Sequence, residues 1–235
     1  MIIEKKNTLM IAHRGMSGLE KENTAASFIV AGAHNYFGIE CDIHKTIDNI
    51  YVVIHDDNTS RVSPLNLMIK DSTYEILRDI MLYDNNGIQR SHLRIPTLDE
   101  YLDICIRYQK ACVIELKDFF TVSEIKEIIN IIERKNYLEH CIFISFIVNN
   151  LLFLRELNSK FSMQLLANEV TNDMLNLCCK YRFDVDINYK GISNELIKKL
   201  HFHNIKVNAW TVDDPSIATL LINWGVDYIT TNILE

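Results

Sequence analysis

Short hydrophobic runs alternate with longer amphipathic stretches along the whole chain. Eight of these runs have the length and the β-branched content that are typical of strands. The expected strands cover residues 8–14, 38–43, 111–117, 141–146, 162–167, 183–187, 205–211 and 227–231. Helix starts follow several of them. Thr24 is expected to cap one helix, Thr97 and Glu100 form a capping box for another, and Ser123 precedes a third.

The C-terminal third carries equally clear helix signals. Ser193 precedes one helix, Asp214 and Pro215 begin the next, and Gly225 is well placed to end it. Eight strand-then-helix units in 235 residues give about 29 residues per unit, close to the roughly 250-residue norm of a βα barrel. The competing doubly wound sheet usually has a Gly-rich first turn, which is missing here. We therefore predict an α/β fold, an eight-fold βα (TIM) barrel.

Residues 43–55 interrupt this alternation. Asp48 and Asn49 can form a two-residue turn, since Asn tolerates positive φ, and the following YVVIH would then run antiparallel to GIECDIH. With that turn, residues whose numbers add to 97 face each other, so His55 is expected opposite Asp42.

A second interruption covers residues 60–95, with one expected helix at 72–83 and a turn at 84–87. We interpret it as a small insertion after the second-strand hairpin, over the barrel mouth. The chain has only seven Gly, three Pro and no low-complexity linker. Residues 1–235 are therefore expected to form a single barrel domain that carries this insertion.

Composition narrows the possible partners. The chain is 48% hydrophobic and 23% charged, as is ordinary for a soluble protein, and its net charge of −7 argues against nucleic-acid binding. Six cysteines show neither a CxxC pair nor a regular framework, so we expect reduced, mostly buried thiols. The first residues contain no apolar run long enough for a signal peptide or spanning helix. A cytoplasmic protein without a stable membrane anchor is expected.

Ionisable side chains collect at the ends of the first strands of the predicted barrel. The carboxyl ends of barrel strands form the active sites of this fold. Seven such side chains are expected to converge there: His13, Arg14, Glu40, Asp42, His55, Glu115 and Lys117.

The charges of this set indicate a chemistry. Three carboxylates in a poorly solvated mouth repel one another unless protons or a cation offset them. An all-oxygen set favours a hard ion, Mg²⁺ or Ca²⁺, over zinc. With such an ion, Arg14 and Lys117 make the pocket locally cationic, which suits a phosphate group. His13 and His55 beside that phosphate are typical of paired general acid and base.

Each of these elements also has a simpler interpretation. A Glu-x-Asp pair on a strand is more often a solvated face, and His13-Arg14-Gly15 can be only a strand end and turn. The His55-Asp56-Asp57 stretch can be a turn, Trp210 can be core packing, and His44 is interpreted as the outward continuation of the hairpin. The convergence of the set favours a site.

With these residues identified, the chain resembles the glycerophosphodiester phosphodiesterase family. The matching stretches are HRG at 13–15, ENTAASF at 22–28, GIECDIHKTIDNIYVVIHD at 38–56, IPTLDEYL at 95–102, IELK at 114–117, ISF at 144–146, AWTVDD at 209–214 and GVDYITTN at 225–232. The resemblance implies the βα barrel, a small insertion after the His-Asp motif and a divalent metal. It also implies hydrolysis of small-molecule glycerophosphodiesters to glycerol 3-phosphate and an alcohol.

The resemblance also implies roles for individual residues. These are metal ligation by Glu40, Asp42 and Glu115, acid–base catalysis by His13 and His55, phosphate contacts from Arg14 and Lys117, and a pocket wall at Trp210. The chain departs from the family pattern at three places. Lys21 replaces the usual Pro, Asn49 the usual hairpin Gly, and the last strand ends Thr-Thr-Asn without the common Asp and Pro. None of these departures removes a catalytic group.

Several alternatives stay open on the sequence. The nucleophile can be water or the neighbouring glycerol hydroxyl, by way of a cyclic phosphate, and either histidine can be the acid. A ring-forming phospholipase D-like enzyme of the same barrel type is a second hypothesis for the function. A non-catalytic phosphate-ligand binding barrel is a third, and it predicts at least one missing ligand or histidine. Headgroup preference, metal identity and oligomeric state are not indicated.

Overall fold

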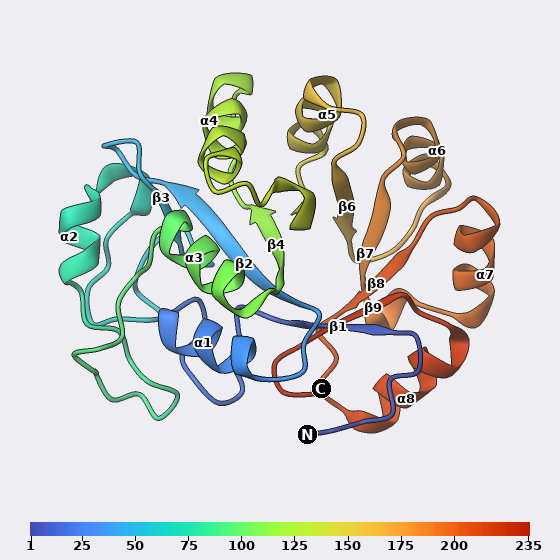
Figure 1. Ribbon diagram of the computed structural model, residues 1–235, viewed down its shortest axis with the longest axis horizontal. Helices are drawn as coiled ribbons and strands as arrows, with labels where there is room; N and C mark the ends of the chain where they lie inside the picture. The colour runs from blue at the N-terminus through green and yellow to red at the C-terminus, as the bar shows by residue number, and fades with distance from the viewer.

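The computed structural model describes residues 1–235, in which eight parallel strands close into a ring with helices around the outside (Figure 1). The ring strands are β1 (Leu9–Ala12), β2 (Gly38–Lys45), β4 (Ala111–Leu116), β5 (Cys141–Ser145), β6 (Ser162–Ala167), β7 (Asp184–Asn188), β8 (Val207–Trp210) and β9 (Tyr228–Thr231). They pair in sequence order, and the β1–β2 pairing closes the ring. The predicted barrel is confirmed, with strand bounds within about two residues of those expected.

The helices are α1 (Ala25–Ala33), α2 (Tyr74–Asp79), α3 (Leu98–Tyr108), α4 (Val122–Glu133), α5 (Val148–Leu157), α6 (Asn172–Tyr181), α7 (Asn194–Phe202) and α8 (Pro215–Trp224), with short 3₁₀ turns at Ile69–Asp71, Leu138–His140 and Tyr189–Gly191. Seven helices alternate with the ring strands, whereas α2 lies in the segment between β3 (Tyr51–Val53) and α3. No helix follows β9, so the last of the eight expected strand-then-helix units has no helix. No helix combines the length and the apolar character that crossing a membrane requires. All six cysteines are free thiols, and five of them are buried.

Most helix starts follow the predicted caps, with one correction. Thr24 and Thr97 accept hydrogen bonds from the backbone at the third helical position, as expected. Ser123, however, lies inside α4, and its cap is Thr121. The side chain of Glu124 returns to the Thr121 N–H at 2.8 Å. Thr121 and Glu124 thus form the reciprocal capping box, which satisfies two otherwise unpaired donors and outcompetes a start at Ser123.

The hairpin forms, but its predicted register is wrong by one residue. Strand β3 (Tyr51–Val53) pairs antiparallel with the end of β2 and lies outside the ring, with Ile43 opposite Val53. The Asn49 N–H donates to the Thr46 carbonyl, and Asn49 has a φ of 64°. This geometry is a turn followed by a left-handed residue in a three-residue loop, so the two-residue turn is excluded. Asp42 consequently bonds to the backbone of Ile54 and not to that of His55.

The segment between β3 and α3 has a hydrophobic cluster of its own. Its helical part is shorter than the expected 72–83, since α2 covers only Tyr74–Asp79 after the 3₁₀ turn. The turn at 84–87 is confirmed by a 3.0 Å bond from the Gly87 N–H to the Asp84 carbonyl. The cluster joins the segment to β3 through Val52, Ile54, Val62, Ile69, Leu77, Ile80, Leu82, Leu93 and Ile95.

The interior of the ring is filled below the mouth and open above it. One large cluster packs the outer faces of the strands against the helices, and a smaller one fills the interior. The interior cluster consists of Ile11, Val113, Ile142, Ile144, Leu166 and Tyr228. Because side chains alternate along each strand, the residues two positions further along the same faces enter the mouth. These positions include Glu115 on β4 and Thr230 on β9.

Candidate active site

A cavity of about 390 Å³ opens at the carboxyl ends of the strands. It is lined by His13, Arg14, Glu40, His55, Glu115, Lys117, Ile144, Phe146, Leu166, Asp186, Trp210 and Thr230. Asp42 lies directly beside it, in ion pairs with Arg14 and Lys117. All eight residues singled out in the sequence therefore meet at one place.

Three carboxyl groups form the centre of this cavity. Glu40 and Asp42 lie on β2, and the parallel register places Asp42 directly beside Glu115 on β4. One oxygen from each group falls within 4.8 Å of the other two, and all three residues are buried. Glu40 Oε1 and Asp42 Oδ1 are buried without any hydrogen-bond partner. Unpartnered oxygens that converge in this way fit a hard divalent cation.

The ionisation of the three carboxyl groups reflects their crowding. Burial raises the pKa of Glu40 well above its ordinary value, and the neighbouring Asp42 and Glu115 raise it further. Burial and Asp42 likewise raise the pKa of Glu115 to about 7. Burial would also raise the pKa of Asp42, but Arg14 and Lys117 hold it below its usual range. Asp42 is thus the member of the trio that ionises most readily, and where a cation is absent the other two keep their protons to a higher pH than free carboxyl groups do.

Arg14 is held by its backbone as well as by its side chain. It has a φ of 54°, which directs its N–H to Glu40 Oε2 at 2.8 Å. Its guanidinium lies 3.4 Å from Asp42 and bonds to Glu22 at 3.0 Å. A left-handed backbone is strained for a residue with a Cβ, and such strain concentrates at functional sites. Gly15, with a φ of 78°, continues this turn, and a Cβ there would clash with Ser27.

Lys117 faces the trio from the loop after β4. Its ammonium group lies 2.9 Å from Glu115 and 3.6 Å from Asp42. Burial would lower the pKa of Lys117, but these carboxylates raise it, so the side chain stays charged. Arg14 and Lys117 therefore supply two fixed positive charges beside the carboxyl trio.

His13 is fixed by the end of the last strand. Its Nδ1 lies 2.8 Å from the amide oxygen of Asn232, whose amide nitrogen donates to Asp213 at 2.6 Å. The Asp213 carboxylate can only accept, so the amide oxygen faces His13 and the imidazole proton lies on Nδ1. Burial and the nearby Arg14 charge lower the pKa of His13 to about 4. The imidazole is therefore neutral at pH 7, with Nε2 free to accept a proton.

His55 is oriented by a carboxylate instead of an amide. Its Nδ1 donates to Asp56 at 2.6 Å, and Asp56 also accepts a 2.6 Å bond from Arg61. Burial lowers the pKa of His55, while Asp42 and the Asp56 hydrogen bond oppose that shift. Arg61 extends the network with two 2.8 Å bonds to Glu22, which itself binds Arg14. The segment after β3 is thereby joined through Glu22 to Arg14 at the cavity.

Two supporting contacts were missed in the sequence. The first is the Asn23 amide, which donates to Asp42 at 2.7 Å. The second involves His44, whose interpretation as an outward residue is wrong. His44 is 2% exposed, with Nδ1 at 2.9 Å from Asp118 and Nε2 at 3.2 Å from the His55 backbone carbonyl. His44 shares the inward face of β2 with Glu40 and Asp42, and that period-2 pattern was the available signal.

The His44–Asp118 pair should stabilise the protein mainly at low pH. Burial opposes protonation of His44, but the bond and charge of Asp118 raise its pKa above the ordinary value. The stabilisation is complete below the unfolded pKa near 6.5 and disappears as pH rises through the higher folded value. Because Asp118 is partly exposed, Asp118→Asn should lower the free energy of unfolding by only about 0.5–1 kcal/mol at pH 5.5.

Urea denaturation at pH 5.5 and pH 9 measures this difference, which should shrink at the higher pH. Asp103→Asn is the matched control, since Asp103 pairs with Lys135 at the surface and Lys135 stays charged at both values. Equal losses at both pH values for Asp118→Asn would argue against the pair.

The wall opposite the trio is aromatic and aliphatic with one acid. Trp210 and Phe146 pack edge to face, with ring centroids 5.8 Å apart. The Trp210 indole N–H donates to the backbone carbonyl of Asp186 at 3.1 Å, which fixes the ring. Trp210 thus lines the cavity, and Asp186 is an inward-facing acid that the sequence analysis did not identify.

Comparisons with known proteins agree with this arrangement. The model of the glycerophosphoryl diester phosphodiesterase family matches residues 13–235. A glycerophosphodiester phosphodiesterase from Caldanaerobacter subterraneus is 29% identical over 237 residues, covering 96% of this chain and 94% of its own. A crystal structure of a glycerophosphodiester phosphodiesterase from Parabacteroides distasonis superimposes with a TM-score of 0.80 at 28% identity, covering 97% and 94%.

A third protein has the same fold at lower sequence identity. A phosphodiesterase from Oleispira antarctica, solved in complex with its product sn-glycerol-3-phosphate, has a TM-score of 0.87 at 24% identity. The alignment covers 95% of this chain and 92% of that one. Because the family model spans nearly the whole chain, the chain belongs to the glycerophosphoryl diester phosphodiesterase family, and it is a phosphodiesterase.

Proposed function

We propose that the protein hydrolyses glycerophosphodiesters to glycerol 3-phosphate and an alcohol in the cavity at the barrel mouth. The observation that carries this proposal is the meeting of three buried carboxyl groups with two imidazoles in one cavity. Family membership supports the substrate class. The residue pattern is complete, which separates this proposal from a phosphate-binding barrel that has lost its catalytic groups.

Glu40, Asp42 and Glu115 would hold a divalent cation. Their oxygen donors suit Mg²⁺ or Ca²⁺, and the two buried unpartnered oxygens supply open coordination positions. When bound, such an ion supplies Lewis-acid activation of the phosphate and orients the substrate. The guanidinium of Arg14 and the ammonium of Lys117 would stabilise the charge that develops on the phosphoryl oxygens.

The hydrogen-bond partners of the two histidines favour different roles. His13 faces a neutral amide and has a low pKa, so its free Nε2 is suited to take the proton of the attacking hydroxyl or water. Burial lowers the pKa of His55, but the Asp56 carboxylate at its Nδ1 opposes that shift and favours the protonated imidazole. We therefore assign His13 as the base and His55 as the acid that protonates the leaving alcohol.

A panel of glycerophosphodiesters with choline, ethanolamine, glycerol and inositol headgroups, assayed with and without chelator, tests the proposal. Phosphorus NMR should show glycerol 3-phosphate as the end product, and the chelator should abolish turnover. With lysophosphatidylcholine added to the panel, a lasting cyclic phosphate from that lysolipid would instead identify the ring-forming phospholipase D-like alternative. Metal binding without turnover of any diester would support the non-catalytic alternative.

Metal binding should release protons near neutral pH. The pKa of Glu115 is raised to about 7 and that of Glu40 also lies well above its ordinary value, whereas ligands must be deprotonated. Mg²⁺ or Mn²⁺ affinity should therefore rise with pH between about 6 and 8. Calorimetric titrations at pH 6.5 in buffers of different ionisation enthalpy should report release of about one to two protons. A binding enthalpy that does not depend on the buffer would contradict the protonation of Glu40 and Glu115.

A further inference from the structure

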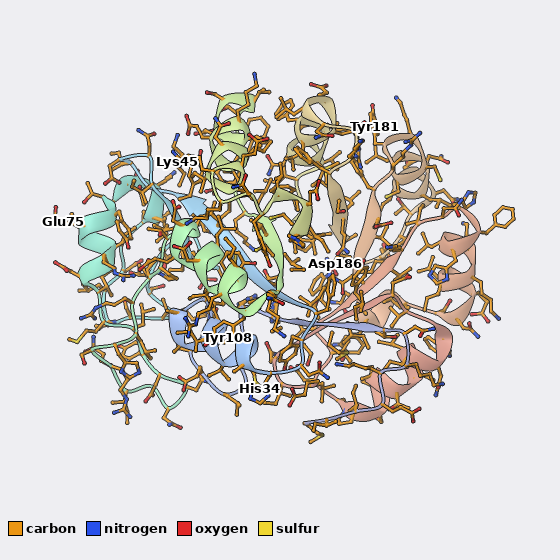
Figure 2. All side chains as sticks on the ribbon, in the orientation of Figure 1. His34, Lys45, Glu75, Tyr108, Tyr181 and Asp186 are labelled. Carbon is orange, nitrogen blue, oxygen red and sulfur yellow. The ribbon has the colours of Figure 1, made fainter.

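Asp186 is an acid inside the catalytic cavity to which neither the sequence motifs nor the proposed mechanism gives a role. It lies on β7, which is four strands away from β2 in either direction around the ring. Asp186 therefore faces the cavity from the side opposite Glu40 and Asp42. Figure 2 shows it among the strands in the middle of the molecule, and it is only 2% exposed.

The Asp186 carboxyl group has no partner in the protein. Its Oδ1 is fully buried and accepts no hydrogen bond. Two polar groups on β8 and β9 are engaged elsewhere: Asn208 donates to Gln164 at 3.0 Å, and Thr230 donates to Asn208 at 3.1 Å. The Trp210 indole N–H donates to the Asp186 backbone carbonyl and not to the carboxyl group.

A structural role does not explain this carboxyl group. Burying a polar group without a hydrogen bond destabilises the folded protein, and an apolar residue of similar size would pack here at less cost. The other cavity residues near it include Ile144, Phe146 and Leu166, which cannot donate. Burial, with a smaller effect from Glu115, raises the pKa of Asp186 well above its ordinary value, as expected for an acid that lacks a partner.

We propose that Asp186 is a specificity-determining residue whose carboxyl oxygen accepts a hydrogen bond from the terminal glycerol hydroxyl of the bound substrate or from a hydroxyl or ammonium group of its headgroup. This inference rests on the proposed function, because the cavity is the one that holds the phosphodiester. With the phosphate beside Arg14 and Lys117, the parts of the substrate that extend across the ring reach β7. A donor delivered there satisfies the oxygen that the protein leaves unpaired.

Two parts of a glycerophosphodiester carry such a donor. One is the terminal hydroxyl of the glycerol half, which extends farther from the phosphate than the secondary hydroxyl that all three test compounds keep, and the other is an N–H or O–H of the headgroup. Three diesters separate them. Glycerophosphoethanolamine has both donors, glycerophosphocholine has no headgroup donor, and the 1,2-propanediol analogue of glycerophosphocholine lacks the terminal hydroxyl as well.

The test compares wild-type protein with Asp186→Leu, which keeps the branched shape of the side chain but removes the acceptor, and Asp186→Asn, which keeps an acceptor. We expect Asp186→Leu to raise KM by about 10- to 100-fold on substrates that carry the donor, with kcat within about threefold. Asp186→Asn should recover most of that loss. The propanediol analogue should bind both variants as it binds the wild type.

Each outcome has a definite meaning. If Asp186→Leu raises KM for both glycerophosphoethanolamine and glycerophosphocholine, the donor is the glycerol hydroxyl. If it raises KM for glycerophosphoethanolamine alone, the donor is the headgroup ammonium. An equal rise in KM for all three diesters, or no rise for any of them, overturns the inference and leaves the proposed function intact.

Two controls keep the test decisive. Thermal unfolding should show Asp186→Leu to be no less stable than wild type, because the substitution removes an unpaired buried polar group. If Asp186→Leu does not fold, Asp186→Ala takes its place in the test. If the wild type hydrolyses none of the diesters, the proposed function fails separately. The same three compounds are then titrated by calorimetry as ligands, and the same pattern is sought in Kd.

Discussion

Replacing His13 by alanine should lower kcat on glycerophosphocholine with Mg²⁺ by about 10²- to 10⁴-fold, and replacing His55 should have an effect of similar size. Each imidazole lines the cavity with Nδ1 bound to a fixed partner, so Nε2 is the atom available for proton transfer. The measurement is steady-state turnover, with metal affinity determined in parallel. Metal affinity should change little, because neither histidine belongs to the carboxyl trio.

A control variant distinguishes the loss of a catalytic group from a nonspecific effect of replacing a histidine. His203→Ala, at an exposed helix end, should retain wild-type kcat. Because the pKa of His13 is lowered to about 4, protonation of this base should not limit turnover as pH falls from 7 to 5. Near-wild-type turnover in either His13→Ala or His55→Ala would end the acid–base assignment.

Glu115→Gln and Asp42→Asn should both abolish metal-dependent turnover, yet they should change the stability of the metal-free protein in opposite directions. The folded pKa of Glu115 lies above its unfolded value, so its ionisation disfavours the folded state as pH rises from about 4.5 through 7. Glu115→Gln removes that effect and should raise the free energy of unfolding at pH 8 by about 1–3 kcal/mol.

The ionised Asp42 side chain has the opposite effect on the stability of the folded protein. Its folded pKa is depressed by Arg14 and Lys117, so its charge stabilises the folded state above the unfolded pKa near 4. Asp42→Asn leaves two buried cations poorly compensated and should lower the free energy of unfolding by about 3 kcal/mol at pH 8. Chemical denaturation with chelator present measures both variants. If both variants shift stability in the same direction, the charge distribution described here is wrong.

The barrel and the carboxyl trio could be predicted because they depend on local pattern. Period-2 alternation within GIECDIH placed Glu40 and Asp42 on one face, and neighbouring parallel strands brought Glu115 alongside. Strand lengths and capping signals fixed the order of elements. The roles of these residues remain predictions, since the structure places the groups and their function is a separate question.

The remaining features depend on contacts between distant segments. Asn232 meets His13 across 219 positions, and His44 meets Asp118 across 74. Nothing in the local sequence of Asp186 distinguishes it from the polar residues that alternate along any half-buried strand. The predicted hairpin register was wrong for another reason. Asn49 is compatible with a two-residue or a three-residue loop, and only the observed hydrogen bonds decide between the two.

The central claim is that Glu40, Asp42 and Glu115 hold one divalent cation at which the phosphate binds. Anomalous diffraction from crystals soaked with Mn²⁺ and glycerol 3-phosphate tests it most directly. The account predicts one strong peak within about 2.0–2.6 Å of an oxygen from each carboxyl group, with a phosphate oxygen completing the coordination and both imidazoles beside it. A peak elsewhere, or phosphate bound in this cavity with no metal at the trio, would contradict it.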